Sequence, residues 1–197
     1  MRQSETGPQP RLASVANPLR FRHPVRKDGQ AVHDLIDSCE ALDDNSLYCN
    51  FLQCTHFAGT CMLAEMNGEV VGWVSAYRPP EEPETLFVWQ VAVAEAARGR
   101  RLARRLIAKL LASDSCTGVE RLKTTITPDN ASSWRMFEGV ADEFDATISD
   151  KVWLCGEEHF SGDHDSEHML TIGPIDAGDA SATDLDEMPE HTTAKAA

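Results

Sequence analysis

Residues 85–93 read TLFVWQVAV, a nearly unbroken run of β-branched, aromatic and other apolar side chains. A strand with one solvent-facing side alternates apolar and polar residues, whereas a strand covered on both faces is apolar throughout. Pro79 and Pro80 precede the run and end any strand that comes before it. We therefore expect residues 85–93 to form a central strand of a sheet.

A β-hairpin is predicted just before these prolines. Residues 60–66 and 69–77 are both strand-like, and Asn67-Gly68 joins them. This dipeptide suits the two left-handed positions of a type I′ turn, which connects antiparallel strands. The two runs are therefore expected to pair with each other.

Helices and strands on either side complete an alternating pattern. The expected segments are a short strand over 19–23, a helix over 28–38, a second helix after the cap candidate Asn45, a helix over 102–111, a strand over 122–126, and a helix over 131–140 that starts after Asn130. Strands that alternate with helices after a hairpin predict a mixed α/β fold with a parallel step in the middle of the sheet.

Length and composition limit the organisation of the chain. Its 197 residues fit one domain, which we expect over residues 19–174, with a flexible arm over 1–18 and a flexible acidic tail over 175–197. The net charge of −14 argues against nucleic acid or an anionic membrane as a partner. Neither a transmembrane run nor the apolar core of a signal peptide occurs, so a cytoplasmic location is expected.

The six cysteines contain no C-x-x-C pair and lie mostly among apolar neighbours. Buried, reduced thiols are the favoured interpretation, with a metal site or a disulfide framework as the alternative. Asp163, Asp165 and Glu167 are acidic neighbours, but they do not form a complete oxygen-ligand loop for a divalent ion. We therefore expect no bound metal.

A cluster of basic residues follows the central strand. Six of the 18 basic residues of this acidic chain fall between positions 98 and 109, at the start of the expected helix over 102–111. Unpaired backbone N–H groups in a first helical turn bind anions, and arginine adds charge-assisted hydrogen bonds. On charge alone, a solvated basic helix face is an equal alternative.

The sequence Arg98-Gly99-Arg100-Arg101-Leu102-Ala103 resembles the acyl-CoA signature of the GNAT N-acetyltransferase superfamily, Arg/Gln-x-x-Gly-x-Gly/Ala. The resemblance implies a mixed central sheet flanked by helices, in which a bulged central strand splays from its parallel neighbour. It also implies that these six residues hold the pyrophosphate of acetyl-CoA, and that Val91, Ala92 and Val93 face the pantetheine arm. Arg101 departs from the signature, which has glycine there because a side chain restricts positive φ and close approach.

Longer blocks resemble the branch of this superfamily that acetylates the γ-amine of L-2,4-diaminobutyrate, a step of ectoine biosynthesis. The blocks are FVWQVAV at 87–93, LARRL at 102–106, TTITPDN at 124–130 with Ser133, Trp134 and Phe137, Leu42-Asp43 with Asn45, Ser46 and Tyr48, and Gly162 with His164, Asp165, Glu167 and Ile172-Gly173-Pro174. The resemblance covers about residues 19–174 and implies a homodimer.

By this resemblance, the substrate site contains Asp43, Tyr48, Trp89, His164 and Glu167. Asp43 would bind an ammonium group, and Trp89 would form a wall or contact the cation through its ring. Asp43, Tyr48 and Glu167 are the candidates for catalysis, and a backbone N–H near Val91 would polarise the thioester carbonyl. From the residues alone, each assignment has an open alternative: a helix cap for Asp43, ordinary core packing for Tyr48 and Trp89, and an inert surface position for His164.

Asn130, Ser133 and Phe137 are assigned by the same resemblance to the acetyl-CoA site. Many members of the superfamily place on this helix a tyrosine that protonates the departing thiolate, whereas this chain has phenylalanine at position 137. Its two tyrosines, Tyr48 and Tyr77, lie elsewhere, so no general acid is assigned. An acetyltransferase for another small amine, or an acyl-CoA-binding module without turnover, are the alternative functions.

Overall fold

The protein is described by a computed structural model over residues 19–39, 42 and 45–176. The strands are β1 (Arg20–Arg22), β2 (Met62–Met66), β3 (Glu69–Tyr77), β4 (Thr85–Val93), β5 (Arg121–Ile126), β6 (Thr147–Leu154) and β7 (Glu167–Gly173). The α-helices are α1 (Gly29–Asp37), α2 (Leu47–Gln53), α3 (Leu102–Leu111), α4 (Ala131–Glu143) and α5 (Gly156–Phe160). The expected arm over 1–18, and the tail from residue 177 onward, lie outside the described residues.

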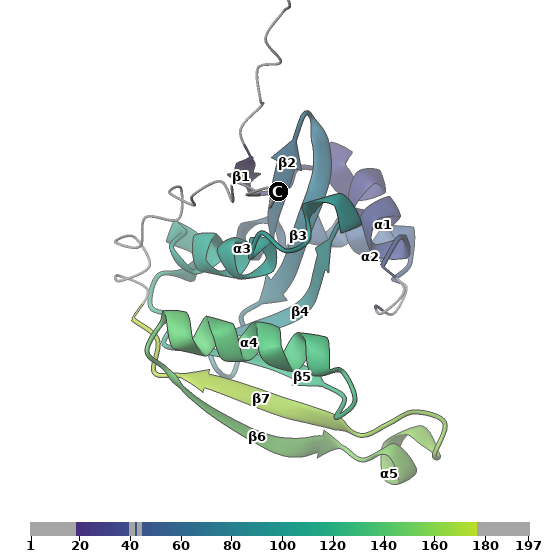
Figure 1. Ribbon diagram of the computed structural model, residues 1–197, viewed down its shortest axis with the longest axis vertical. Coiled ribbons are helices and arrows are strands. Elements are labelled where there is room, and N and C mark those ends of the chain that lie inside the picture. Colours follow the sequence, from purple (N-terminus) through teal and green to yellow (C-terminus); the bar gives the residue numbers. More distant parts are fainter. Residues whose placement is uncertain (1–18, 40–41, 43–44, 177–197) are drawn as a thin grey trace, which may run out of the picture.

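All seven strands form one sheet in the order β1-β2-β3-β4-β5-β7-β6 (Figure 1). The apolar run at 85–93 is the fourth of these strands, which confirms its predicted central place. Its pairing with β5 is parallel, and the other neighbouring pairs are antiparallel. The mixed α/β fold with a parallel step is therefore confirmed.

The turn between β2 and β3 has the predicted chemistry. Asn67 and Gly68 both have positive φ, at 56° and 84°. Two adjacent left-handed residues give the turn a twist that matches the twist of the flanking strands. Gly72, further along β3, leaves little room for a side chain, because a Cβ there would lie 3.0 Å from a methyl group of Leu106 in α3. This contact brings α3 close to the sheet.

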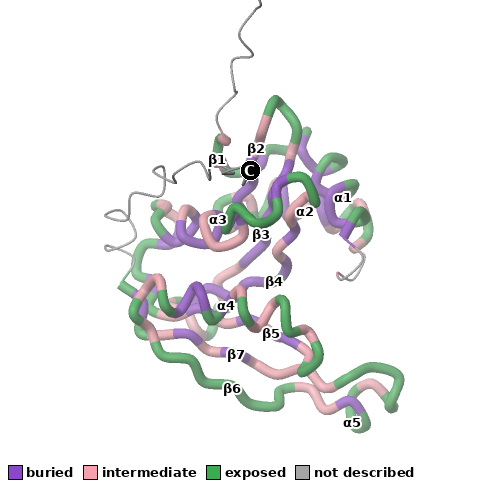
Figure 2. Tube along the Cα trace, in the orientation of Figure 1, coloured by how far each residue is buried: buried purple, intermediate pink, exposed green. Residues whose placement is uncertain are grey.

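The sheet separates two hydrophobic clusters, as the alternation of side chains along a strand requires. In β2, Leu63 packs with α1, whereas its neighbours Met62 and Ala64 belong to the larger cluster with α3 and α4. Figure 2 shows the buried residues concentrated in the middle strands and on the inner sides of the helices. Ile175 is 4% exposed within the larger cluster, so we propose that the domain extends at least to this residue.

The first helices differ from expectation in one detail. The cap of α2 is Ser46, whose hydroxyl accepts a hydrogen bond from the backbone N–H of Cys49 at 3.2 Å. Asn45 was the predicted cap, but its side-chain Nδ2 donates to Oε1 of Gln90 in β4 at 2.6 Å. The side chain of Asn45 thus contacts β4 instead of capping α2.

The last third of the domain completes the sheet in a way that the sequence patterns did not predict. β7 returns between β5 and β6 and pairs antiparallel with both. β6 therefore becomes an edge strand, exposed on both sides along most of its length (Figure 2). Ile148, Val152 and Trp153 are large apolar residues exposed on it.

Candidate active site

The two parallel strands in the middle of the sheet part at Phe87. β4 pairs with β3 as far as Val93, but its pairing with β5 covers only residues 85–87. The second half of β4 thus has no strand partner on the β5 side among the described residues. Its backbone is available there to a ligand, and the splayed central strand pair expected from the sequence is confirmed.

A β-bulge lies at the point where the strands part. Ser75 of β3 pairs with Gln90 and Ala76 pairs with Val88, so Trp89 has no partner in the ladder. A bulge re-aims side chains next to it, and Trp89 is 49% exposed between two buried neighbours. The bulge that the sequence resemblance implied in this strand is present.

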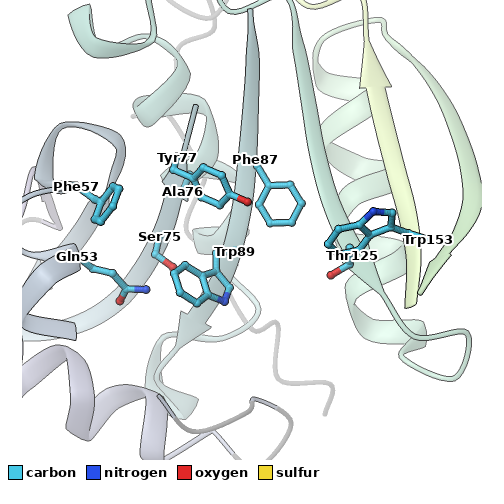
Figure 3. Close-up of a pocket in the computed structure, with 9 residues that line it drawn as sticks. All are labelled: Gln53, Phe57, Ser75, Ala76, Tyr77, Phe87, Trp89, Thr125 and Trp153. Carbon is cyan, nitrogen blue, oxygen red and sulfur yellow. The ribbon is translucent and has the colours of Figure 1, made fainter. Parts of the chain in front are cut away.

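A second bulge lies in β6. Val152 pairs with His168 and Leu154 pairs with Glu167, which leaves Trp153 unmatched. Trp153 is also 49% exposed, and it faces the same cavity as Trp89 (Figure 3). Two bulges in different strands therefore supply two indole rings to one cavity.

This cavity has a volume of about 440 Å³ and lies on the α2 side of the sheet (Figure 3). Its lining residues are Gln53, Phe57, Ser75, Ala76, Tyr77, Phe87, Trp89, Thr125 and Trp153. The rings of Tyr77 and Phe87, whose centres lie 5.1 Å apart, belong to this lining together with the two indoles. None of these described lining residues carries a formal charge. An ammonium group in such surroundings has a lowered pKa, because desolvation disfavours its charged form.

The loop before α3 has the geometry of an anion site. Gly99 has φ of 77°, and a Cβ on it would meet no atom within 4 Å, so this stretch of backbone faces open space. Arg98, Gly99, Arg100 and Arg101 are all exposed, and α3 begins immediately after them. Free N–H groups of the first helical turn and exposed guanidinium groups thus lie together, as pyrophosphate binding requires.

Two arginines of the basic cluster have structural partners instead. Nη1 of Arg104 donates to the carbonyl of Gly139 in α4 at 3.4 Å. The guanidinium of Arg105 lies 5.1 Å from the centre of the Phe21 ring, within the range of a cation–π contact. The cationic cluster that faces solvent is therefore centred on the loop before α3.

The other residues assigned to acetyl-CoA differ in their surroundings. Val91 and Val93 are half-buried in the part of β4 that has left β5, whereas Ala92 is buried against α1. Leu102 is buried in the larger cluster, and Ala103 is half-buried in the first turn of α3. Beyond the bulge, Val91 and Val93 therefore pack against the larger cluster, and Ala92 packs in the smaller cluster on the other face of the sheet.

The assigned residues of α4 have structural roles. Asn130 caps the helix, since its Oδ1 accepts from the backbone N–H of Ser133 at 3.0 Å. Phe137 is 3% exposed in the larger hydrophobic cluster. The cap fixes the direction in which the first turn of α4 points.

The structure brings one of the predicted substrate residues, Trp89, into the cavity. Tyr48 lies on α2 with 72% exposure and does not belong to the lining. His164 is exposed, with Nδ1 2.8 Å from the carbonyl of Asp165. Glu167 is half-buried opposite Leu154, the residue after Trp153. Asp43 lies outside the described residues.

Sequence reasoning missed most of the lining. Gln53 is a polar residue of α2 that is only 2% exposed, and a buried polar residue indicates a polar contact. The sequence does not show where this contact lies. Ser75 lies within an apolar strand and is 1% exposed, which is a similar signal. Trp153 belongs to a segment without a sequence prediction. Tyr77, Phe87 and Thr125 were placed in expected strands or in blocks of resemblance, but they were given no role in the site.

Three buried thiols are poor nucleophiles. Burial raises the pKa of Cys54 and that of Cys61 to about 12, and it also raises the pKa of Cys116. None of the three lines the cavity. At neutral pH they are protonated, and a thiol is far less nucleophilic than a thiolate.

Two further findings concern the described part of the chain. No group of three or more His, Cys, Asp or Glu side chains is arranged there to hold a metal ion. No helix within residues 19–39 and 45–176 has the length and apolar character needed to cross a bilayer.

Comparison with solved structures supports the fold. A diaminobutyrate acetyltransferase from Paenibacillus lautus, in complex with L-2,4-diaminobutyric acid and coenzyme A, matches with a TM-score of 0.76 at 40% identity, over 80% of this chain and 96% of that one. The ribosomal-protein-S18-alanine N-acetyltransferase from Escherichia coli matches with a TM-score of 0.58, 14% identity and coverage of 80% and 94%, which reflects the shared fold.

Sequence comparison gives the same relationship. The Acetyltransferase (GNAT) family matches residues 30–140. An L-2,4-diaminobutyric acid acetyltransferase from Methylotuvimicrobium alcaliphilum is 45% identical over 81% of this chain and 92% of its own length. One from Vibrio cholerae is 45% identical over 80% and 91%. The chain therefore belongs to the acetyltransferase (GNAT) family and, within it, to the L-2,4-diaminobutyric acid acetyltransferases.

Proposed function

We propose that the protein transfers the acetyl group of acetyl-CoA to the γ-amine of L-2,4-diaminobutyrate. The observation that carries this proposal is the aromatic cavity at the point where β4 parts from β5. A thioester that enters between the two strands would meet an amine held in the cavity. The related enzymes named above, one of them bound to diaminobutyric acid and coenzyme A, support the choice of both substrates.

The neutral cavity prepares the amine for attack. A deprotonated amine is required, because its lone pair must form the new N–C bond while the C–S bond breaks and its electron pair leaves with sulfur. The aromatic surroundings favour the deprotonated form of the amine. As the N–C bond forms, the attacking nitrogen loses one proton, and the departing thiolate gains one, so that the products are the N-acetylated amine and the free thiol of coenzyme A. Trp89 forms the wall against which the amine lies.

Other predicted residues complete the proposed site. Backbone N–H groups near Val91 would stabilise the negative charge that develops on the thioester oxygen. Arg98, Gly99, Arg100 and Arg101 would hold the pyrophosphate, with the pantetheine along Val91 and Val93. Asp43 is proposed to bind an ammonium group of the substrate, with Tyr48, His164 and Glu167 as further substrate contacts.

We infer direct transfer in a ternary complex without an acetylated enzyme. The high pKa values of Cys54 and Cys61 leave these thiols protonated, which argues against them as acetyl carriers. The test is to mix the full chain with acetyl-CoA alone and measure its mass. Accumulation of a chain heavier by one acetyl group would contradict direct transfer.

We also propose a homodimer that acts in the cytoplasm during adaptation to salt. The exposed apolar side chains of edge strand β6 support a second copy as a partner for this face, because single chains seldom leave such a strand uncovered. Acetyl-CoA is a metabolite of the cell interior, and the product would be a precursor of a compatible solute.

The proposed function is tested by a thiol-release assay with a panel of amines. Diaminobutyrate, ornithine, lysine and putrescine are offered with acetyl-CoA, and the acetylated nitrogen is then identified. We expect the highest kcat/KM for diaminobutyrate, with acetylation at the γ-nitrogen. A higher kcat/KM for putrescine would indicate a polyamine enzyme. Coenzyme A binding without thiol release with any amine would indicate a binding module.

A further inference from the structure

Two buried polar groups in the cavity are not explained by the fold. Gln53 of α2 is 2% exposed and Ser75 of β3 is 1% exposed. Neither Nε2 of Gln53 nor Oγ of Ser75 has a hydrogen-bond partner among the described residues, and both residues line the cavity. Burial of an unpaired polar group is unfavourable, so such groups are usually kept for a ligand or another partner.

A chain of hydrogen bonds sets the direction of the Gln53 amide. Nδ1 of His33 in α1 lies 3.0 Å from Oδ1 of Asn50, and Nδ2 of Asn50 donates to Oε1 of Gln53 at 3.1 Å. With the Gln53 oxygen occupied, its Nε2 is the free end. Figure 3 shows this nitrogen on the side of Gln53 where Ser75 and Trp89 lie. Gln53 therefore presents N–H donors to the cavity, and Ser75 presents a hydroxyl.

We propose that Gln53 and Ser75 bind the carboxylate of the acceptor amino acid. This inference rests on the proposed function. Donor groups require an acceptor, and the carboxylate is the acceptor group of diaminobutyrate, whose ammonium groups only donate. Hydrogen bonds to an ionised acceptor are roughly twice as strong as neutral ones, which suits a cavity whose other described lining residues are mostly aromatic.

The order of the strands distinguishes the carboxylate from the other acceptor in the complex, the thioester oxygen. In the sheet, β3 lies on one side of β4 and the opening toward β5 lies on the other. Ser75 is on β3, and Gln53 is on the side of the cavity away from Thr125 of β5 (Figure 3). The two donors thus lie across β4 from the opening through which we propose that the thioester enters.

This placement explains which nitrogen is acetylated. The α-amine of diaminobutyrate is on the carbon that carries the carboxylate, and the γ-amine is two carbons further away. A carboxylate held by Gln53 and Ser75 keeps the α-amine on their side and directs the γ-amine toward the opening at Phe87. The pair would then determine both the class of acceptor and the position of acetylation.

The test compares diaminobutyrate with 1,3-diaminopropane, which is the same molecule without its carboxylate. Ser75→Ala removes one donor, and Gln53→Glu replaces the donor by an acceptor of the same shape. We expect each to lower kcat/KM for diaminobutyrate by about 10- to 100-fold, the usual effect of losing a hydrogen bond to a charged group. The value for 1,3-diaminopropane should change by less than about twofold in Ser75→Ala.

Asn50→Asp tests the hydrogen-bond chain without touching the cavity. Aspartate at this position has no N–H to give to Gln53, so the Gln53 amide is expected to turn and donate to it. The amide oxygen would then face the cavity and repel a carboxylate. As a positioning residue, Asn50 should change the ratio of kcat/KM for the two substrates in the direction of Gln53→Glu.

Thr124→Val is the matched control, because it removes a buried hydroxyl from the other face of the sheet. The ratio of kcat/KM for diaminobutyrate to kcat/KM for 1,3-diaminopropane should stay as in the unmodified chain. Thermal unfolding of each variant checks the fold. Equal losses of kcat/KM for diaminobutyrate and 1,3-diaminopropane would overturn the proposal. They would mean that Gln53 and Ser75 contact the thioester or only stabilise the fold.

The two proposals fail in different ways. If the unmodified chain prefers ornithine or lysine, the proposed substrate is wrong but carboxylate binding by Gln53 and Ser75 stands, provided that the variants lose activity on that amino acid. If it prefers 1,3-diaminopropane to every amino acid offered, carboxylate recognition is overturned as well.

Discussion

At the scale of single residues, Arg101 has an unusual backbone. It precedes α3 with φ of 54° and ψ of 23°, in the left-handed region where a Cβ is unfavourable. The acyl-CoA signature has glycine at this position, and the reason is now visible, since the loop requires a positive φ there. This chain accepts the strain and gains an exposed guanidinium beside the proposed pyrophosphate site.

Arg101→Gly is therefore expected to raise the free energy of unfolding by about 1 kcal/mol, because relief of the left-handed strain exceeds the extra chain entropy of glycine. Arg101→Ala keeps the Cβ and removes the charge, so it should not stabilise the protein. Urea unfolding measures both. Coenzyme A titrations of the two variants then separate charge from conformation: tighter binding by Arg101→Gly alone would mean that the side chain obstructs the site.

Asp28 is the second residue with a measurable consequence. It is 6% exposed and accepts two hydrogen bonds from Arg22, at 2.6 and 2.9 Å, and one from the backbone N–H of Val25 at 2.7 Å. Arg22 also donates to Glu65 at 2.6 Å. The Arg22 guanidinium, through these hydrogen bonds, holds the pKa of Asp28 below its usual value. The network ties β1 to β2 and to the start of α1.

Asp28→Asn should lower the free energy of unfolding by about 2–3 kcal/mol at pH 7, because it removes the negative charge beside Arg22 and one of the two oxygens that accept its hydrogen bonds. A lowered pKa in the folded state gives stability that is complete above the unfolded pKa of about 3.9 and is lost as pH falls through the folded value. The difference between the two proteins should therefore shrink below about pH 4. Denaturant unfolding from pH 3 to 7 tests this, and a constant difference would contradict it.

At the scale of elements, the two bulges make the cavity. Trp89 and Trp153 each lie where a ladder skips one residue, in strands that are separated by β5 and β7 in the sheet. Regular pairing at either position would restore strict alternation and change which side chains face the cavity. Both indoles therefore reach the cavity through irregularities of the sheet.

The start of α4 provides a test of a proposed acetyl-CoA contact. Asn130→Ala should cost about 1 kcal/mol in unfolding free energy, since the hydrogen bond to the Ser133 N–H is lost, whereas Asn130→Ser keeps a capping oxygen. If Asn130 acts only as a cap, coenzyme A affinity should follow stability and recover in the serine variant. A loss of affinity in both variants would instead indicate contact with the cofactor.

At the scale of the whole molecule, edge strand β6 decides the proposed assembly. Val152 is 55% exposed on this strand. Val152→Lys is expected to convert the dimer to a monomer, because lysine on an edge strand opposes the burial of that face. Light scattering measures the mass. Val25→Lys is the control, since Val25 is 48% exposed outside the sheet and should leave the dimer intact. A dimeric Val152→Lys variant would exclude β6 from the interface.

Much of the fold was predictable because its signals are local. The bounds of α3 match the expected helix over 102–111, and the Asn67-Gly68 turn has the φ values that the dipeptide favours. Strand β4 was recognised from its own side chains. The C-terminal part was not predicted, because the insertion of β7 between β5 and β6 depends on pairing between segments distant in the chain.

The candidate site divides in the same way. The sequence by itself determined the basic loop at 98–101, because helix ends, glycine and charge act over a few residues, whereas Trp89 was assigned through the resemblance to a known family. Only the tertiary structure decided that Arg104 binds α4, that Trp153 joins Trp89, and that Gln53 and Ser75 meet in one cavity. These contacts join helices and strands far apart in sequence, so their chemistry depends on how the sheet bulges and parts.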